Sequence, residues 1–166
     1  MRESIGSAWL MIIVMTFITL FSGYLAFSIN YSKSFRVKDG IVERIQKHNG
    51  LVKTGSKSTL KEIDDFLAEI GYNAKGNCFK FCNEEGNDFA GINGTTFKQN
   101  PSDRELFNYC LVKVRAYQSG TNVMTSSYYK VIVFFSLRIG SISLLSSFHT
   151  QGETQTLYYA TDDYFR

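Results

Sequence analysis

The longest apolar stretch in the chain is residues 8–29, which holds 22 residues without a charge or a proline. As a helix it would be about 33 Å long, close to the roughly 30 Å hydrocarbon core of a bilayer. A helix is expected because hydrocarbon leaves backbone groups no other partner. Trp9 and Tyr24 lie toward its two ends, where aromatic rings favour the membrane interface. We therefore expect residues 1–30 to be a membrane anchor and residues 31–166 to form one further domain.

Two other interpretations of this stretch stay open. A cleaved signal peptide would use Ala26, Phe27 and Ser28 as its small-x-small site, although the run exceeds the about 7–15 apolar residues of a signal core. A buried core helix is the second, although so long an uncharged helix is unusual in a domain of this size.

One side of the anchor carries small or hydroxyl side chains. Thr16, Thr19, Ser22 and Gly23 interrupt its apolar surface, and residues of this kind often face another helix in a membrane, here through Thr16, Thr19 and Gly23. We expect helix packing in the membrane at these positions, although a threonine hydroxyl can also bond to its own helix.

Helical periodicity continues beyond the anchor, over residues 31–49. Val37, Ile41 and Ile45 recur every four residues, and the dipeptide at residues 49–50, Asn-Gly, is a stop signal. This half predicts an amphipathic helix, either continuous with the anchor or separated from it by a hinge at residues 30–34. Gly40 weakens the helix and is expected to mark a bend.

A shorter helix is predicted over residues 59–70. Thr59 and Glu62 have the spacing of a capping box, and Gly71 is a terminator. Its apolar stripe is typical of core packing and consists of Leu60, Ile63, Phe66, Leu67 and Ile70.

The rest of the chain predicts strands. Residues 72–103 are irregular and rich in glycine and asparagine, and we expect short strands or a disulfide-closed excursion there. A helical turn is expected over residues 104–109. Alternating patterns then predict an antiparallel β-meander, which would give an α+β fold whose sheet the Val37–Ile45 stripe covers. Its predicted strands are residues 110–117, 126–139, 143–150 and 154–159, with turns at Gly140–Ser141 and Gly152–Glu153.

Charge does little to define a partner. The formal net charge is +3, without a basic tract, so nucleic-acid binding is not expected. Lys33, Arg36 and Lys38 follow the anchor, which by the positive-inside rule favours a cytoplasmic domain. We nevertheless expect an extracytoplasmic domain, because the seven residues before the anchor are a poor substrate for export and cysteines are typical of secreted folds.

The three cysteines, Cys78, Cys82 and Cys110, are candidates for one disulfide, and the sequence leaves open which two would pair. Zinc is the weaker alternative, since neither His48 nor His149 stands at a ligand spacing. No phosphate-binding loop, dinucleotide fingerprint or nucleophile elbow is present. We therefore expect no enzyme activity, no catalytic residue, no metal and no cofactor.

Short motifs add a family resemblance. MRESIG at residues 1–6, INYSK at residues 29–33 and GETQT at residues 152–156 are similar to small single-pass proteins that accompany Tad-type (Flp) pili in Gram-positive bacteria. The whole layout resembles type IV pilin-like proteins, although Met11 stands where pilins usually carry a glutamate. The resemblance implies a pseudopilin or minor pilin whose helix packs in a filament or assembly platform.

The expected function is therefore that of a membrane-anchored structural or assembly protein of a pilus or secretion system. Its partners would be the membrane and other pilin-like or secretion-system proteins, including copies of itself. Two alternatives are a surface protein that binds a ligand through residues 72–103 and a domain released after Ser28.

Overall fold

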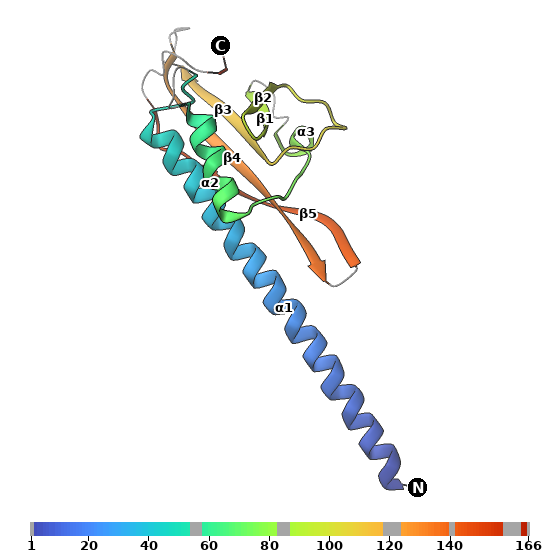
Figure 1. The fold of residues 1–166 in the computed structure, drawn as a ribbon. Coiled ribbons are helices and arrows are strands. Elements are labelled where there is room, and N and C mark those ends of the chain that lie inside the picture. Colours follow the sequence, from blue (N-terminus) through green and yellow to red (C-terminus); the bar gives the residue numbers. More distant parts are fainter. Residues whose placement is uncertain are drawn as a thin grey trace.

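A single long helix dominates the molecule (Figure 1). The computed structural model describes residues 2–53, 58–82, 87–117, 124–139, 142–157 and 164–165. Helix α1 (Arg2–Lys47) has 46 residues and runs without a break through both predicted segments, so the hinged alternative is wrong. At about 1.5 Å per residue it is about 70 Å long. It stops as predicted, with Asn49 and Gly50 at positive φ angles of 53° and 132°.

The C-terminal half of α1 packs on the sheet through one stripe. Val37, Ile41 and Ile45 are fully buried and share a core cluster with residues of the central strands. Their four-residue spacing keeps them on one side of the helix, which confirms that this stripe covers the sheet. Gly40 is buried beneath the ring of Phe66, so the glycine marks a helix crossing and not the predicted bend.

Helix α2 (Thr59–Ile70) packs beside α1 through Leu60, Ile63 and Leu67. It ends as predicted at Gly71, which adopts the left-handed conformation at φ 65° and ψ 42°. The predicted capping box is wrong: Ser58 is the N-cap residue, and no side chain caps the helix.

The two residues of that expected box have other partners. The Thr59 hydroxyl accepts a hydrogen bond from the Val52 amide (3.1 Å) and donates to the Gly50 carbonyl (3.2 Å). Glu62 binds Lys47 and His48 at the end of α1. Thr59 therefore binds the segment between the two helices, where buried backbone groups need partners, and Glu62 connects α2 to the end of α1.

Residues 72–103 hold the short strands that the sequence predicted, together with a short helix that it did not predict. They form α3 (Cys78–Cys82), β1 (Asp88–Asn93) and β2 (Thr96–Gln99), with a hairpin turn at Gly94. The helical turn expected over residues 104–109 is wrong, because Phe107 forms an antiparallel bridge with Gly76 and Tyr109 already begins the next strand.

Three long strands complete an antiparallel sheet in the order β2-β1-β3-β4-β5. They are β3 (Tyr109–Tyr117), β4 (Met124–Ile139) and β5 (Ile142–Glu153). The turn expected at Gly152 is wrong, since Gly152 pairs with Val131 inside the ladder. Beyond β5 the chain continues along the same edge of β4, where Leu157 bridges Ser127. Both Gly140–Ser141 and residues 158–159 of the last predicted strand lie outside the described residues.

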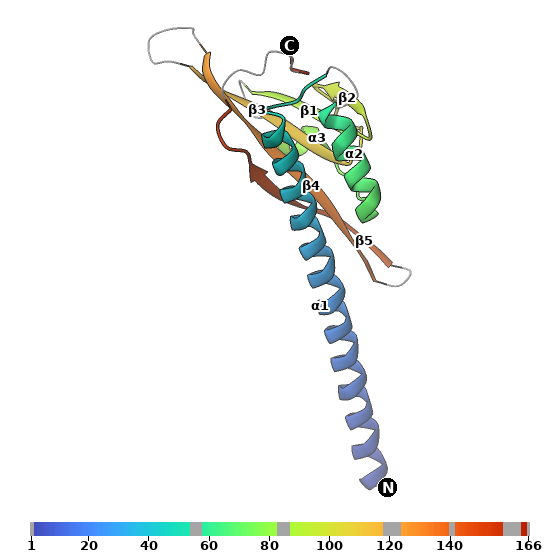
Figure 2. The same ribbon diagram turned by 60° about the vertical axis from the view of Figure 1, so that its left-hand side comes forward.

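Both faces of the sheet are covered. Helices α1 and α2 lie on one face (Figure 2), where Tyr109, Leu111 and Tyr129 join the larger core. The other face carries α3 and a second cluster that includes Cys110, Ile132 and Phe134. Odd and even strand positions thus enter different cores, as the period of two requires. The predicted α+β class, with a long helix, a short helix and an antiparallel sheet, is confirmed.

Candidate functional site

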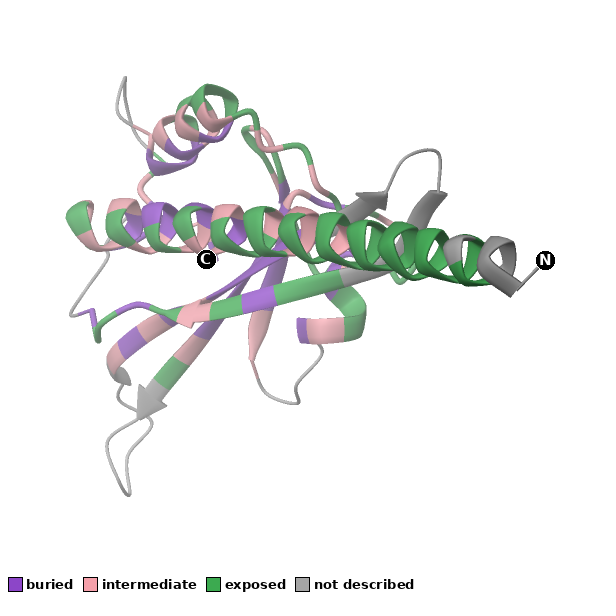
Figure 3. Ribbon diagram, turned by 90° about the horizontal axis from the view of Figure 1, so that it is seen from below, coloured by how far each residue is buried: buried purple, intermediate pink, exposed green. Residues whose placement is uncertain are grey.

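The N-terminal half of α1 extends away from the rest of the molecule with its apolar surface uncovered. From Trp9 to Leu25 the large apolar side chains are 45–69% exposed. Figure 3 shows this change along the helix, from exposed turns to buried ones. Within the part of the chain that the structure describes, α1 is the one helix long and apolar enough to cross a membrane, and no part of its apolar window is buried. A soluble core helix would be buried, whereas a signal sequence would share this exposure.

The small-residue positions of the apolar half are satisfied within the helix. The Thr16 and Thr19 hydroxyls donate to the carbonyls of Ile12 and Met15, each at 2.8 Å. Such bonds remove the polar cost of a hydroxyl in lipid. Gly23, which has no side chain, is half-buried. Whether another helix packs here stays a prediction.

These three positions share a side of α1 with the buried stripe. Thr16, Thr19 and Gly23 each lie 18 residues before a buried residue, and 18 residues are five turns of about 3.6. The corresponding residues are Ser34, Val37 and Ile41, which are at most 1% exposed. The small-residue face therefore continues the face on which the sheet is packed.

An aromatic cluster joins α1 to the sheet where the apolar half ends. Phe27, Tyr31 and Phe35 repeat every four residues on α1, and Phe135 of β4 and Phe148 of β5 face them. Phe27 contacts Phe135 and Phe148 with ring centroids 6.2 and 6.0 Å apart, and Tyr31 lies 5.9 Å from Phe135. We call these five residues the aromatic collar. Sequence reasoning missed it, although the repeat of aromatic residues at positions 27, 31 and 35 was a signal.

A hollow of about 230 Å³ lies beside the collar, between α1, the segment after α2 and β4. Its lining is largely polar and comprises Asn30, Lys33, Ser34, Tyr72, Asn73, Ala74 and Phe135. The Lys33 ammonium donates to the Gly71 carbonyl at 2.9 Å, which places a cation at this hollow.

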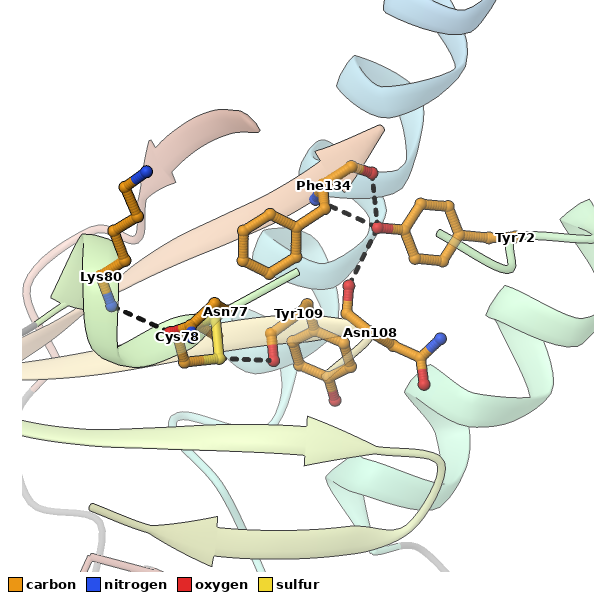
Figure 4. The surroundings of a disulfide bond; sticks show 8 residues. Tyr72, Asn77, Cys78, Lys80, Asn108, Tyr109 and Phe134 are labelled. Carbon is orange, nitrogen blue, oxygen red and sulfur yellow. Dashed lines mark hydrogen bonds between the residues drawn. A yellow bond between two sulfur atoms is a disulfide. The ribbon is translucent and has the colours of Figure 1, made fainter. Parts of the chain in front are cut away.

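Tyr72 forms one wall of the hollow and closes the sheet at its lower end (Figure 4). Strand β3 begins at Tyr109 opposite Val133, so the next residue of β4 lacks a strand partner on that side. The Tyr72 hydroxyl takes this place: it accepts from the Phe134 amide (3.1 Å), and its proton reaches the carbonyls of Phe134 (2.7 Å) and Asn108 (2.9 Å). Burial raises the pKa of Tyr72 well above its ordinary value.

The disulfide joins Cys78 of α3 to Cys110 of β3, across 32 positions of sequence (Figure 4). One disulfide among the three cysteines was predicted, and the structure identifies the pair. Cys82 is buried in the same cluster and stands outside this bond. The bond fixes α3 to the second face of the sheet, far in sequence from the strand it covers.

Among the described residues, no group of three or more histidine, cysteine or acidic side chains could hold a metal ion. One charged contact between helices joins Glu62 to Lys47 (2.8 Å) and to His48 (2.6 Å). Hydrogen bonds from Lys47 and then His48 lower the pKa of Glu62 to about 2. Since the contact holds the two helices together, its evident role is structural.

Protein-family models, curated proteins and solved structures were each compared with the chain, and none matches.

Proposed function

We propose that the chain is a single-pass, membrane-anchored structural protein that assembles, in the manner of a pilin-like protein, with components of a pilus or secretion system. Residues 8–29 would lie in the membrane, and the disulfide-closed α+β domain would lie outside the cell. The protein would act without catalysis, by holding its domain at a fixed height and by packing its membrane helix against a partner.

One observation carries the proposal: α1 is a continuous helix that is exposed and apolar in one half and central to the domain's core in the other. Burial of the stripe at Val37, Ile41 and Ile45 fixes the second half rigidly in the domain. A force or displacement applied to the membrane half is therefore passed to the domain without a flexible linker.

The geometry favours assembly through the small-residue side of the anchor. The small residues Thr16, Thr19 and Gly23 allow close approach of a second helix. Ile18 and Leu25 each lie two residues further along, about 200° around the helix, and provide matched controls on the opposite side.

Cysteine cross-linking in native membranes tests this. We expect single cysteines at positions 16, 19 and 23 to form adducts with another membrane helix, and cysteines at positions 18 and 25 to form few. The unsubstituted chain controls for cross-linking through the buried Cys82. Equal adducts on both sides, or none on either, would contradict the assembly face.

The other two expected functions have their own outcomes. A partner that still binds after removal of residues 1–30, and is lost on changes within residues 72–103, would identify a ligand-binding surface protein. A mature N-terminus at Ile29 in the culture medium would identify a released domain and would exclude the anchor.

A further inference from the structure

The lower end of the domain stands at a defined height above the membrane half of α1. Residues 8–29 fill the hydrocarbon core, and Asn30 to Ser34 follow directly, so these residues rise about 1.5–7.5 Å above its boundary. The headgroup layer on each side of a bilayer is about 5–7 Å thick. If the anchor spans the membrane, the hollow beside the aromatic collar therefore lies within that layer.

The aromatic collar connects the sheet to α1 at this height. Phe27 lies in the last turn of the apolar run, and its contacts with Phe135 and Phe148 bring the sheet down to the same level. Figures 1 and 2 both show the ends of β4 and β5 alongside the middle of α1. Tyrosine and tryptophan concentrate at the interface because their rings are amphipathic, and Tyr31 is the collar residue of this kind.

The charge at this height is positive. Residues 30–38 contain three basic side chains and no acidic one. Lys33 lines the hollow beside Asn30, Ser34 and Asn73. One Asn30 N–H donates to the Ala26 carbonyl (2.9 Å), which leaves its second N–H and the Asn73 amide as donors. The Ser34 hydroxyl donates to the Tyr31 carbonyl (2.7 Å) and offers the hollow an acceptor. An ammonium has three donors, and the bond to the Gly71 carbonyl uses one of them. The lysine cation and the two amides together offer donors for a phosphate ester.

We infer that the hollow binds the headgroup of an anionic phospholipid, with its phosphodiester beside Lys33 and its acyl chains along the apolar half of α1. The inference rests on the proposed membrane anchoring. A lipid is favoured over a free anion because the hollow is continuous with the aromatic collar and with the uncovered apolar helix. Glycerol hydroxyls of the headgroup would meet Asn30, Ser34 and Asn73.

The test uses the full chain in vesicles of equimolar phosphatidylcholine and phosphatidylglycerol. After mild detergent extraction and purification, mass spectrometry measures how much of each lipid stays with the protein. We expect phosphatidylglycerol to be retained at least about fivefold over phosphatidylcholine, the factor that about 1 kcal/mol per lysine provides. Retention near the vesicle ratio would overturn the inference.

Two variants separate the hollow from general surface charge. Lys33→Gln removes the cation of the hollow, and Asn73→Phe fills space at an exposed position without changing the charge. Lys33→Gln is expected to reduce retention about fivefold, the factor for one charge near the surface, and Asn73→Phe is expected to reduce it by blocking the hollow. Lys38→Gln removes the same charge from the same helix outside the hollow, where Lys38 pairs with Asp39, and is expected to change little. An equal loss in Lys38→Gln would show diffuse attraction and overturn the site.

The remaining outcomes distinguish the source of the anion and the anchor itself. Displacement of the retained lipid by millimolar inorganic phosphate or glycerophosphate would identify a site for a soluble anion and would overturn the lipid. Failure of the chain to float with vesicles of any composition would instead overturn the membrane anchoring. Flotation with pure phosphatidylcholine vesicles, together with no preference for phosphatidylglycerol, would overturn the hollow alone.

Discussion

The ring of Phe66 occupies the space that a β-carbon at Gly40 would need. A Cβ built on Gly40 would stand 2.2 Å from the Phe66 Cζ atom, far inside van der Waals contact. Helix α2 can therefore approach α1 closely only because position 40 has no side chain. The Arg44 guanidinium lies 3.7 Å from the centre of the same ring, on the next turn of α1.

Gly40→Ala is therefore expected to destabilise the domain, although alanine is favoured over glycine within a helix by about 1 kcal/mol. The overpacking should outweigh this gain and lower the free energy of unfolding by about 1–3 kcal/mol. Chemical denaturation of the full chain in detergent micelles measures the change. Adding Phe66→Leu should restore part of the loss, whereas a Gly40→Ala variant as stable as the wild type would show that the ring moves aside freely.

Breaking the disulfide should cost more. A bond that closes 32 positions of sequence contributes about 3–4 kcal/mol through the entropy of the unfolded chain. The double variant Cys78→Ser/Cys110→Ser should lose about this much in denaturant unfolding. Intact mass under non-reducing conditions provides the control, because Cys82→Ala should remain two hydrogens lighter than its reduced form. Cys82→Ala having the mass of a fully reduced chain would contradict the assigned pair.

Tyr72→Phe removes one oxygen and leaves the backbone groups of Phe134 without their side-chain partner. Unmet buried hydrogen-bonding groups should lower the free energy of unfolding by about 1–3 kcal/mol. Amide exchange should also rise first at Phe134, at the lower end of the sheet. Tyr31→Phe is the matched control, because Tyr31 is 43% exposed and the change keeps its ring in the aromatic collar. Equal effects of the two substitutions would contradict the role given to the Tyr72 hydroxyl.

Acid should loosen the contact between α1 and α2 through Glu62. The pKa of Glu62 in the folded chain, about 2, lies below its ordinary value of 4.5. The contribution of Glu62 to the free energy of unfolding is therefore complete above about pH 4.5 and is lost as the pH falls toward 2. The side chain is one-third exposed, so we expect screening to limit the effect to about 0.5–1 kcal/mol. Unfolding measured across this range should show a shallower acid loss in Glu62→Gln than in the wild type. Glu43→Gln, at an exposed position of α1, should keep the wild-type slope.

Elements set by a regular period were predictable, whereas contacts between distant residues were not. The four-residue repeat of Val37, Ile41 and Ile45 defines a buried side whatever covers it, and the alternation in β3 sends Leu111 and Cys110 to opposite cores. Glu62 has the spacing of a cap, yet it binds Lys47 and His48, which the fold brings from the end of α1. No local sequence pattern shows whether such a side chain caps its own helix or binds a neighbouring helix.

The candidate site shows the same division. The apolar run at residues 8–29 could be recognised directly, because its length and lack of charge are visible without knowing which other segment it contacts. The hollow needed Lys33, Tyr72 and Phe135 to come together from α1, the segment after α2 and β4. The choice of Cys110 as the partner of Cys78 likewise depends on where α3 crosses the sheet.

The shared side of α1 also limits which neighbours can stand beside the anchor. Thr16 and Gly23 lie five turns before Ser34 and Ile41 on the same side of α1, so the domain overhangs the side of the apolar half that is proposed to pack in the membrane. In a second copy at equal height, the C-terminal half of α1 would clash with the overhanging domain. A partner whose helix ends at the membrane surface fits beneath it. A second copy would fit only after displacement along the helix axis, which is the direction in which a helix leaves a bilayer. Contacts between two such subunits would therefore depend on their relative position along that axis.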